Sequence, residues 1–365
     1  MAVRIMLAGG GTGGHLYPAI AIADAVRAIE KDAAVLFIGT KGRIEERVVP
    51  ERGYDLAMIW ISGVRRSFSF ATALVPVKVL TSLVQSYMHI RRFRPDVVVG
   101  TGGYVSGPPV YVASLLGIPT ALQEQNSYPG VTTRLLAGRV QQVHVMFERT
   151  KRFLKRQDNI LMSGNPVRTT IGSVSRAEAA GRLGLDPAKP TLLVTGGSQG
   201  AASMNAAVLE VMPALAAAVI QVLWLTGQRD ADHIQGAVAA MPAAPAGTIL
   251  PYLERMEDAF AVADLMVSRS GASTLAEIAC AGVPSILVPL PTAAGDHQTE
   301  NARAMVEAGA AVLCKDGTAR EELRPLILEL FNDAARRSRM SAAARSIAKP
   351  EASMTIARAI LGLRR

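Results

Sequence analysis

The sequence predicts an α/β protein made of two doubly wound domains. Short apolar runs alternate with helical patterns along all 365 residues, which is the order of β-α-β units around a parallel sheet. Glycine-rich turns follow several of these runs directly. The pattern starts again after Gly164-Asn165-Pro166, and the chain is long enough for two cores. We therefore expect two doubly wound, Rossmann-like domains, the second facing the first.

Strands are expected where short apolar, β-rich runs are bounded by Gly, Pro or polar residues. In the first half these runs lie near 3–8, 34–39, 56–61, 97–100, 119–123, 142–147 and 160–163. In the second half they lie near 191–195, 220–226, 248–250, 264–268, 284–289 and 311–314. The amphipathic stretch 351–363 predicts a helix that crosses back to the first domain. The expected domains are therefore 1–165 with 346–365, and 166–345.

The stretch Leu7–Pro18, LAGGGTGGHLYP, predicts a strand, a glycine turn and a helix N-terminus. Without Cβ atoms, the backbone N–H groups of residues 9–14 can approach an anion closely, and the helix dipole favours negative charge there. We expect a phosphate or diphosphate as the ligand. The glycines also fit G-x-G-x-x-G, but the next strand ends in Gly39-Thr40, where a nicotinamide site needs an acidic residue. A nicotinamide or flavin enzyme is therefore disfavoured.

Two further glycine loops follow predicted strands, at residues 100–107 and 196–201. Because the loops at 9–14 and 100–107 leave the carboxyl ends of strands in one sheet, we expect them to meet at one crevice. The polar segment 123–126, Gln-Glu-Gln-Asn, ends another strand at the same edge.

Two polar segments of the second half suit a hydroxyl-rich ligand. Residues 268–277, SRSGASTLAE, predict a strand, a turn of small residues and a helix that carries Glu277. A carboxylate there can accept two hydrogen bonds from a vicinal diol. Residues 296–301, DHQTEN, gather polar side chains at a strand-to-helix junction, as buried sugar hydroxyls require. A structural interpretation makes Glu277 a solvated helix residue and Asp296 an N-cap.

Positive charge is concentrated in the first half: residues 1–165 hold 20 Lys and Arg against 11 Asp and Glu, whereas the rest holds 19 of each. Between 62 and 95, apolar positions are surrounded by basic ones, a combination that suits the surface of an anionic bilayer. A core helix with basic neighbours is the alternative. Nucleic acid is disfavoured, because aromatic residues make up only 5% of the chain. The apolar positions are Phe68, Phe70, Leu74, Val75, Val79, Leu80, Leu83 and Tyr87, and the basic ones are Arg65, Arg66, Lys78, Arg91, Arg92 and Arg94.

We expect neither a secretory signal nor a membrane-spanning segment, because Gly, Pro or charged residues interrupt each apolar run. Cys280 and Cys314 are interpreted as buried, reduced thiols of a cytoplasmic protein. Residues 230–232, Asp-Ala-Asp, match a D-x-D spacing that can bind a divalent ion and a diphosphate. Because they lie away from the glycine loops, we interpret them as a capped helix start, and we expect no metal and no other cofactor.

Seven segments, in this order and with these separations, resemble the bacterial peptidoglycan glycosyltransferases that add N-acetylglucosamine to a lipid-linked muramyl-pentapeptide. They are GGGTGGH, GTGGYVSGP, EQN, GNPVR, GGSQGA, RSGASTLAE and DHQTENA. The resemblance covers essentially the whole chain. It implies the two-domain GT-B architecture, in which two Rossmann-like domains face each other across a cleft where donor and acceptor meet. The first domain would bind the acceptor and the membrane, and the second would bind the UDP-sugar donor.

This resemblance also implies the partners. The donor would be UDP-N-acetylglucosamine, and the acceptor would be the undecaprenyl-pyrophosphoryl muramyl-pentapeptide. The protein would join the cytoplasmic face of the inner membrane peripherally. An inverting displacement of this kind needs a base and a stabilised diphosphate leaving group.

For the donor, the resemblance implies one set of contacts. Glu277 would hold the ribose hydroxyls, and Arg168 would lie beside the nucleotide. The main chain of Leu253 would face the uracil. The donor site would also include Thr12, Gly13, Gly14, Asn126, Ser198, Ala272, Ser273, Thr274 and Gln298, with Ser198 at the phosphate and Asn126 and Gln298 at the sugar ring. The acceptor diphosphate would meet Gly102, Gly103 and Tyr104, together with the first glycine loop.

His15 is our candidate for the catalytic base, because a histidine directly after a phosphate-binding loop can take a proton near neutral pH. The alternative is that it only hydrogen-bonds the loop or a phosphate. The chain departs from the family at two positions. Many relatives have His where Gln123 stands, which leaves Glu124 as the other possible base. His297 stands where some relatives carry Gln.

Besides the nucleic-acid binding already disfavoured above, two other functions compete with this interpretation. The nearest is another GT-B enzyme that uses a UDP-sugar, such as a diacylglycerol glycosyltransferase or a UDP-N-acetylglucosamine 2-epimerase. The two glycine loops of the first domain favour a diphosphate-bearing acceptor instead. A membrane-docked binding protein without activity is disfavoured by the presence of His15, Glu277 and Gln298.

Overall fold

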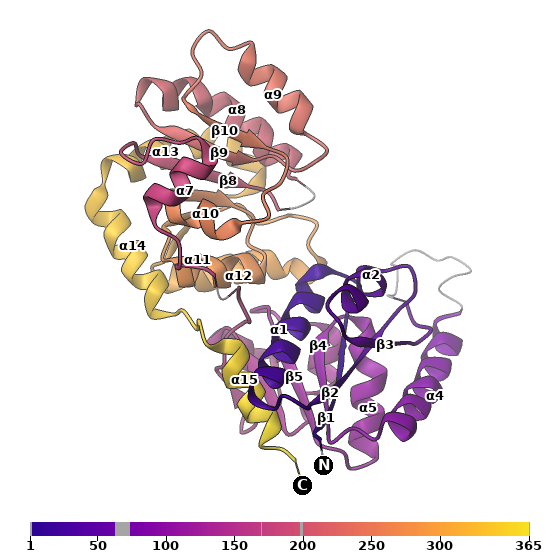
Figure 1. Cartoon of the computed structure of the whole chain (residues 1–365). Helices are drawn as coiled ribbons and strands as arrows, with labels where there is room; N and C mark the ends of the chain where they lie inside the picture. The colour runs from indigo at the N-terminus through magenta and orange to yellow at the C-terminus, as the bar shows by residue number, and fades with distance from the viewer. Residues whose placement is uncertain (1, 63–73, 169, 198–199, 365) are drawn as a thin grey trace. The chain divides into compact units, whose positions relative to one another are not determined.

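The computed structural model describes residues 2–62, 74–168, 170–197 and 200–364 (Figure 1). The chain divides into two compact units. The first is Met1–Val167 with Lys349–Arg365, and the second is Arg168–Ala348. These bounds lie within three residues of those expected from the sequence.

The first unit is built on a seven-stranded parallel sheet in the order β3-β2-β1-β4-β5-β6-β7. All seven runs expected as strands are confirmed. The direction of winding changes between β1 and β4, and such a switch point is where doubly wound sheets bind ligands. The strands are β1 (Arg4–Gly9), β2 (Ala34–Gly39), β3 (Asp55–Met58), β4 (Val97–Gly102), β5 (Thr120–Glu124), β6 (Gln142–Val145) and β7 (Ile160–Leu161).

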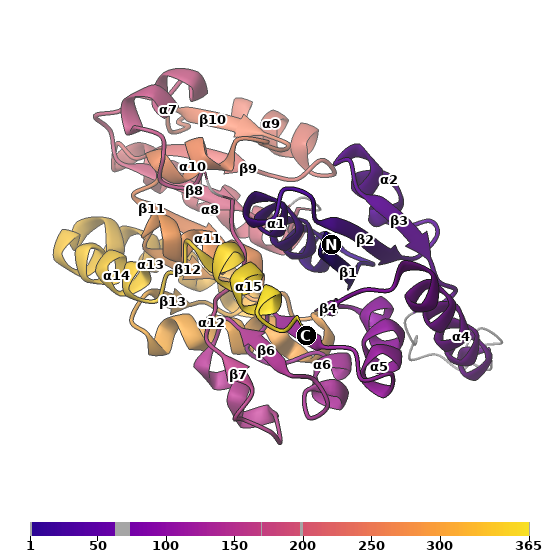
Figure 2. The ribbon, with the colours of Figure 1, turned by 60° about the horizontal axis from the view of Figure 1, so that its bottom comes forward.

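Helices cover both faces of this sheet (Figure 2). Ile5 and Leu7 of β1 pack in one core with α1, α2 and α15, whereas Met6 and Ala8 pack in another with α4, α5 and α6. This alternation explains the uninterrupted apolar strands, because strands buried on both faces need apolar residues on each. The helices are α1 (Gly13–Ile29), α2 (Ile44–Glu51), α4 (Val75–Phe93), α5 (Gly107–Leu115), α6 (Val131–Leu136) and α15 (Ala352–Leu361), with a 3-10 turn, η1 (Tyr104–Ser106), before α5.

The last helix confirms its prediction. Ile356, Ala357, Ile360 and Leu361 of α15 are buried in the first core, although the helix follows the whole second unit along the chain. The spacing of these residues places them on one helix face, as an amphipathic helix requires.

The second unit repeats the architecture with a six-stranded parallel sheet in the order β10-β9-β8-β11-β12-β13. All six expected strands are confirmed, and the switch point lies between β8 and β11. The strands are β8 (Thr191–Thr195), β9 (Gln221–Leu225), β10 (Gly247–Leu250), β11 (Leu265–Ser268), β12 (Ser285–Leu287) and β13 (Ala311–Leu313). The helices are α7 (Arg176–Leu183), α8 (Ala202–Ala217), α9 (Ala231–Ala239), α10 (Met256–Val262), α11 (Ala272–Ala281), α12 (His297–Glu307), α13 (Ala319–Asn332) and α14 (Ala334–Ser346).

Two residues predicted to cap helices occupy the N-cap position but do not make the capping hydrogen bond. Asp230 and Asp296 occupy the N-cap positions of α9 and α12, but neither side chain caps its helix. Asp230 Oδ2 accepts a hydrogen bond from Asn205 Nδ2 at 2.8 Å, and Asp296 Oδ1 accepts one from Thr299 Oγ1 at 2.6 Å. These side-chain partners replace the backbone N–H groups that an N-cap would bind.

Cys280 and Cys314 are not joined by a disulfide, and their burial differs. Cys314 is fully buried, and this burial raises its pKa to about 12, so it is unreactive near neutral pH. Cys280 is only partly buried, which corrects the expectation for that residue.

Candidate functional site

In the first unit, the N-terminus of α1 stands at the switch point. The Thr12 side chain makes no capping hydrogen bond, and the first turn, which contains Gly13 and Gly14, holds no acidic residue. The N–H groups and the positive end of the helix dipole therefore suit an anion, as the glycine loop predicts.

A buried carboxylate that sequence reasoning missed holds the glycine loop. Glu45 is fully buried, and its Oε2 accepts a hydrogen bond from Gly11 N at 3.0 Å. Its Oε1 accepts from Thr40 N at 3.1 Å and from Thr40 Oγ1 at 2.9 Å. A Cβ on Gly10 would lie 2.5 Å from Glu45 Oε1. Gly10 and Gly11 thus serve the internal structure of the loop, and the sequence signal was an acidic residue shortly after the second strand.

The two glycine loops of this unit meet at His15, as expected. Thr101 Oγ1 donates to the His15 carbonyl oxygen at 2.8 Å. A Cβ on Gly102 would lie 2.6 Å from His15 Nδ1, and one on Gly103 would lie 3.3 Å from its Cδ2. Both glycines have positive φ, 103° and 75°. Their first structural role is therefore to seat the imidazole, which the predicted diphosphate contact did not include.

Tyr104 also lies at this junction. A Cβ on Gly11 would be 3.4 Å from its phenol oxygen, so the two glycine loops approach each other here as well.

Glu124 is not placed to act as a base. Its Oε1 accepts from Asn126 N at 3.0 Å and Asn126 Nδ2 at 3.2 Å, and its Oε2 accepts from Gly130 N at 3.0 Å and Thr133 Oγ1 at 2.6 Å. The side chain is buried, and four donors occupy its lone pairs. Glu124 therefore orients Asn126 and the start of α6.

In the second unit, α11 begins at its own switch point. Gly271 at the N-cap has no side chain, and the first turn, Ala272, Ser273 and Thr274, contains no acidic residue. The backbone N–H groups of these three residues start the helix without a side-chain cap, which suits an anionic ligand.

The structure brings Arg168 and Glu277 together beside this turn. Arg168 Nε lies 3.5 Å from Glu277 Oε1, and Arg168 Nη1 donates to the carbonyl oxygen of Glu254 at 3.2 Å. The Glu277 side chain is 15% exposed. Burial raises the pKa of the Glu277 carboxyl, and the Arg168 guanidinium opposes that rise. Arg168 also ties this pair to the segment that holds Leu253, which is half-buried.

Gln298 lies at the start of α12, and part of its side chain is already engaged. Its Oε1 accepts from Leu290 N at 3.0 Å. Ser270 Oγ donates to the Gln298 carbonyl oxygen at 2.8 Å, and Asn301 Nδ2 donates to the Ser270 carbonyl oxygen at 3.2 Å. These bonds fasten α12 to the turn before α11, and the Gln298 amide N–H groups remain suited to a ligand. Ser198 lies outside the described residues.

Arg269 is a positioning residue that sequence reasoning missed. Its side chain is buried, and Nη1 donates to the carbonyl oxygens of Val288 and Pro289, each at 3.1 Å. The same nitrogen pairs with Asp316 Oδ1 at 2.6 Å. A buried charge needs such partners, and they hold the end of β12 beside the α11 turn.

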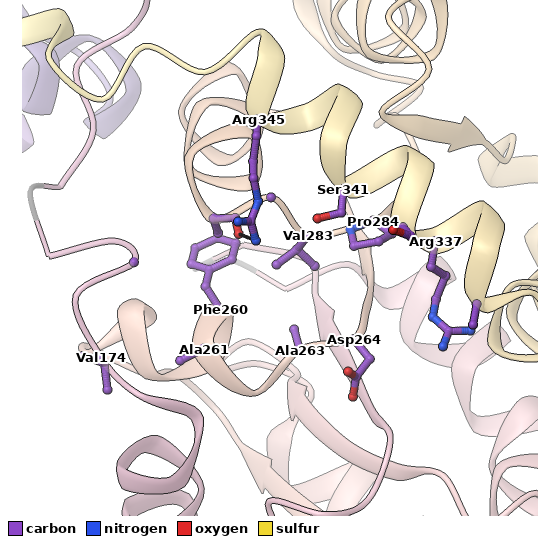
Figure 3. Close-up of a pocket in the computed structure, with 15 residues that line it drawn as sticks. Val174, Phe260, Ala261, Ala263, Asp264, Val283, Pro284, Arg337, Ser341 and Arg345 are labelled. Atoms are coloured by element: carbon purple, nitrogen blue, oxygen red, sulfur yellow. Dashed lines mark hydrogen bonds between the residues drawn. The ribbon is translucent and has the colours of Figure 1, made fainter.

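A cavity of about 440 Å³ in the second unit lies away from these loops (Figure 3). It is lined by the C-terminal end of α11 and by α14, from which Ser341 and Arg345 project. Arg345 Nη2 donates to the Ala281 carbonyl oxygen at 3.3 Å, and Arg337 Nη1 donates to the Phe331 carbonyl oxygen at 2.6 Å. Since these arginines serve the C-terminal ends of α11 and α13, the cavity is not our candidate site.

Among residues 2–62, 74–168, 170–197 and 200–364, no group of three His, Cys, Asp or Glu side chains is arranged to hold a metal ion.

Comparison with known proteins shows which protein family the chain matches. Residues 5–145 match the glycosyltransferase family 28 N-terminal domain, and residues 191–356 match the family 28 C-terminal domain. The chain is 42% identical over 368 residues to the UDP-N-acetylglucosamine–N-acetylmuramyl-(pentapeptide) pyrophosphoryl-undecaprenol N-acetylglucosamine transferase of Prosthecochloris aestuarii, covering 99% of each chain. It is 41% identical over 363 residues to the transferase of the same name from Salinibacter ruber, covering 99% of this chain and 97% of the relative. The crystal structure of Acinetobacter baumannii MurG superposes with a TM-score of 0.80 at 29% identity, covering 99% of each chain.

Two doubly wound sheets, each with a helix N-terminus open to an anion at its switch point, are the architecture of the GT-B glycosyltransferases. Within that class, the chain belongs to glycosyltransferase family 28. The family match and the transferase relatives establish that it is a glycosyltransferase, and they exclude the nicotinamide and flavin interpretations.

Proposed function

We propose that this protein transfers N-acetylglucosamine from UDP-N-acetylglucosamine to undecaprenyl-pyrophosphoryl-N-acetylmuramyl-pentapeptide during peptidoglycan synthesis, and so serves cell-wall growth, cell shape and division. The observation that supports the proposal most strongly is identity of about 40% over nearly the full length of relatives with that printed activity. The nucleotide-sugar donor is supported independently by geometry, because Glu277 and Arg168 lie beside the open N-terminus of α11.

In this proposal the second unit binds the donor. The ionised Glu277 carboxylate accepts hydrogen bonds from the two ribose hydroxyls, and Arg168 holds that carboxylate in its charged form. The N–H groups at the start of α11 bind the diphosphate, while the amide of Gln298 binds the sugar. The first unit binds the acceptor, whose diphosphate lies against the N-terminus of α1.

The transfer is a single displacement with inversion. The 4-hydroxyl oxygen of the muramyl sugar attacks C1 of N-acetylglucosamine, and its proton passes to His15. The bond between C1 and the phosphate oxygen breaks, and UDP leaves with the electron pair. Helix N-termini stabilise the charge that develops on the diphosphate, so the scheme requires no metal ion.

The test is release of UDP, measured with and without the lipid acceptor and with a chelator present. Acceptor-dependent release that survives chelation is the expected result. Release without acceptor would indicate an epimerase or a hydrolase instead, and loss of release with chelator would contradict the metal-independent scheme.

We also propose that α4 docks peripherally on the anionic cytoplasmic face of the membrane. The helix turns Ser82, Ser86 and Ile90 into the protein, whereas Leu80 and Met88 are 66% and 62% exposed. A helix that served only as a core element would bury its apolar side, so this arrangement favours a surface role. No helix of the described chain meets the length and hydropathy needed to cross a bilayer.

Other features of α4 and its neighbour support the same surface role. Arg91, Arg92 and Arg94 are exposed at the end of α4, and Trp60 is 48% exposed, with Lys78 Nζ 5.6 Å from its ring centroid. Basic side chains and tryptophan are the residues typical of a membrane interface. Phe68, Phe70, Arg65 and Arg66 of the predicted patch lie outside the described residues.

Sedimentation with vesicles tests this surface. Leu80→Glu should weaken binding to anionic vesicles by about tenfold or more, because it replaces apolar burial worth roughly 1.5–3 kcal/mol with a charge that the bilayer repels. Val219→Glu is the matched control, since Val219 is 64% exposed on the second unit. Equal binding of both variants would contradict the assignment.

A further inference from the structure

We propose that Gln125 is a positioning residue that holds neutral His15 in one tautomer, with the proton on Nδ1 and the lone pair on Nε2. This inference rests on the proposed function in one respect: the proposed reaction makes Nε2 the atom that takes the acceptor's proton. The tautomer itself follows from hydrogen bonds within the first unit.

The contact between the two side chains is direct. His15 Nδ1 lies 3.0 Å from Gln125 Oε1. A histidine nitrogen can either donate or accept, so this distance alone does not place the proton. Its position depends on whether the amide presents its oxygen or its nitrogen to the ring.

Two backbone carbonyl groups settle the orientation of the Gln125 amide. Gln125 Nε2 lies 2.7 Å from the carbonyl oxygen of Thr101 and 3.3 Å from that of Gln123. A carbonyl oxygen only accepts hydrogen bonds, so the amide group facing it must be the NH2. The amide oxygen then faces His15, and since it too only accepts, the proton must be on Nδ1.

The side chain of Gln123 is a second buried amide that hydrogen-bonds to Gln125. Gln125 Nε2 also donates to Gln123 Oε1, and Gln123 Nε2 donates to Asn165 Oδ1 at 3.1 Å. The three amides are at most 2% exposed. Turning Gln125 over would therefore set its oxygen against the oxygens of Thr101 and Gln123, at a cost that burial increases.

His144, the titratable residue next to these hydrogen-bonded amides, does not disturb them. His144 is the strand partner of Gln123, but its Nδ1 pairs with Ser163 Oγ at 2.7 Å and its Nε2 with Gln142 Oε1 at 3.2 Å. Burial lowers the pKa of His144 to about 4, so it is neutral near pH 7. The residues that orient His15 are therefore uncharged amides.

The consequence is a base with one available nitrogen. Among the described residues, His15 Nε2 has no hydrogen-bond partner, and it is the atom left to receive a proton. After it does so, Nδ1–H continues to donate to Gln125, so the ring does not need to turn. A carboxylate performs this orienting task in many hydrolases, whereas here a neutral amide does.

The first measurement is the tautomer of His15 in the intact protein, read from the 15N shifts of its ring in long-range 1H–15N spectra, with His15→Gln to assign the signals. The Nδ1–H form is expected in the wild type. Gln125→Met, which removes the amide but keeps a chain of similar length, should lose that form and lower kcat by about 10- to 100-fold. The KM for UDP-N-acetylglucosamine should change by no more than about twofold, because no donor contact is altered.

Gln123→Met is the matched control, since it also removes a fully buried amide but one that does not touch His15. It should retain the Nδ1–H tautomer and most of kcat, because Thr101 still orients Gln125. An Nε2–H tautomer in the wild type, or a Gln125→Met variant that keeps both the tautomer and kcat, would overturn the inference. A wild type with the Nδ1–H tautomer but no acceptor-dependent UDP release would support this inference while refuting the proposed function.

Discussion

Replacing Gly102 with alanine separates two roles of the second glycine loop, binding of the acceptor diphosphate and seating of His15. The new Cβ would lie 2.6 Å from His15 Nδ1, whereas ordinary contacts begin at 3.4 Å. The ring must therefore move by the difference, 3.4 − 2.6, or about 0.8 Å. A displacement of about 1 Å at a catalytic group can cost roughly 100-fold in rate. We expect kcat to fall about 100-fold, with the KM for the acceptor nearly unchanged.

Backbone strain is the confounding effect, and Gly117 controls for it. Gly102 has φ of 103° and Gly117 has φ of 70°, and nothing lies within 4 Å of a Cβ built on Gly117. An alanine forced to positive φ costs about 1–2 kcal/mol. Both variants should therefore lose thermal stability, whereas only Gly102→Ala should lose activity.

Steady-state UDP release with varied acceptor, together with thermal denaturation, measures both effects. A Gly102→Ala enzyme with wild-type kcat would refute the proposed seating of His15. A raised acceptor KM at unchanged kcat would instead support the diphosphate contact that the sequence resemblance implies. A Gly117→Ala enzyme that lost activity equally would show that strain alone explains the result.

Three further predictions concern other parts of the molecule. Because burial raises the pKa of Glu277, affinity for UDP should fall as the pH drops through that raised value. In calorimetric titrations, Glu277→Gln should bind UDP about tenfold more weakly and lose this pH dependence. The control variant Glu254→Gln should keep both the affinity and its pH dependence. Glu45→Ala leaves three hydrogen-bond donors without their acceptor and should destabilise the first unit by roughly 3 kcal/mol in denaturant unfolding. The control variant Glu46→Ala, at an exposed position, should destabilise it by about 1 kcal/mol or less. Ile360→Ala removes a fully buried side chain of α15 and should destabilise the same unit by about 2–5 kcal/mol, and a loss below about 1 kcal/mol would show that the helix is dispensable there.

Local patterns in the sequence were sufficient to predict the strands and the candidate loops. The run Val97-Val98-Val99 is buried on both faces of the sheet, and its composition indicates this without knowledge of the fold. The glycines of the first loop predicted a turn into a helix, and α1 begins at Gly13. Most candidate site residues came from the resemblance to a glycosyltransferase family, and their contacts with ligands stay predictions.

Local patterns failed where the fold, rather than the adjacent residues, supplies a side chain's partner. Asp230 resembles an N-cap, but Asn205 claims its carboxylate. Glu124 resembles a possible base, but Gly130 and Thr133 occupy it. In both cases a partner brought by the fold competes with the local interaction, and composition does not reveal that partner.

The pattern of residues along the chain was enough to predict two parallel-sheet domains, their glycine loops, and a last helix with one apolar face. The fold was needed to find that α4 turns its serines inward, that Glu45 holds Gly11, and that Gln125 meets His15. The difference comes from separation along the chain. Periodicity and glycine content act over a few residues, whereas His15 and Gln125 are 110 residues apart and meet only because β1 and β5 both flank β4 in one sheet.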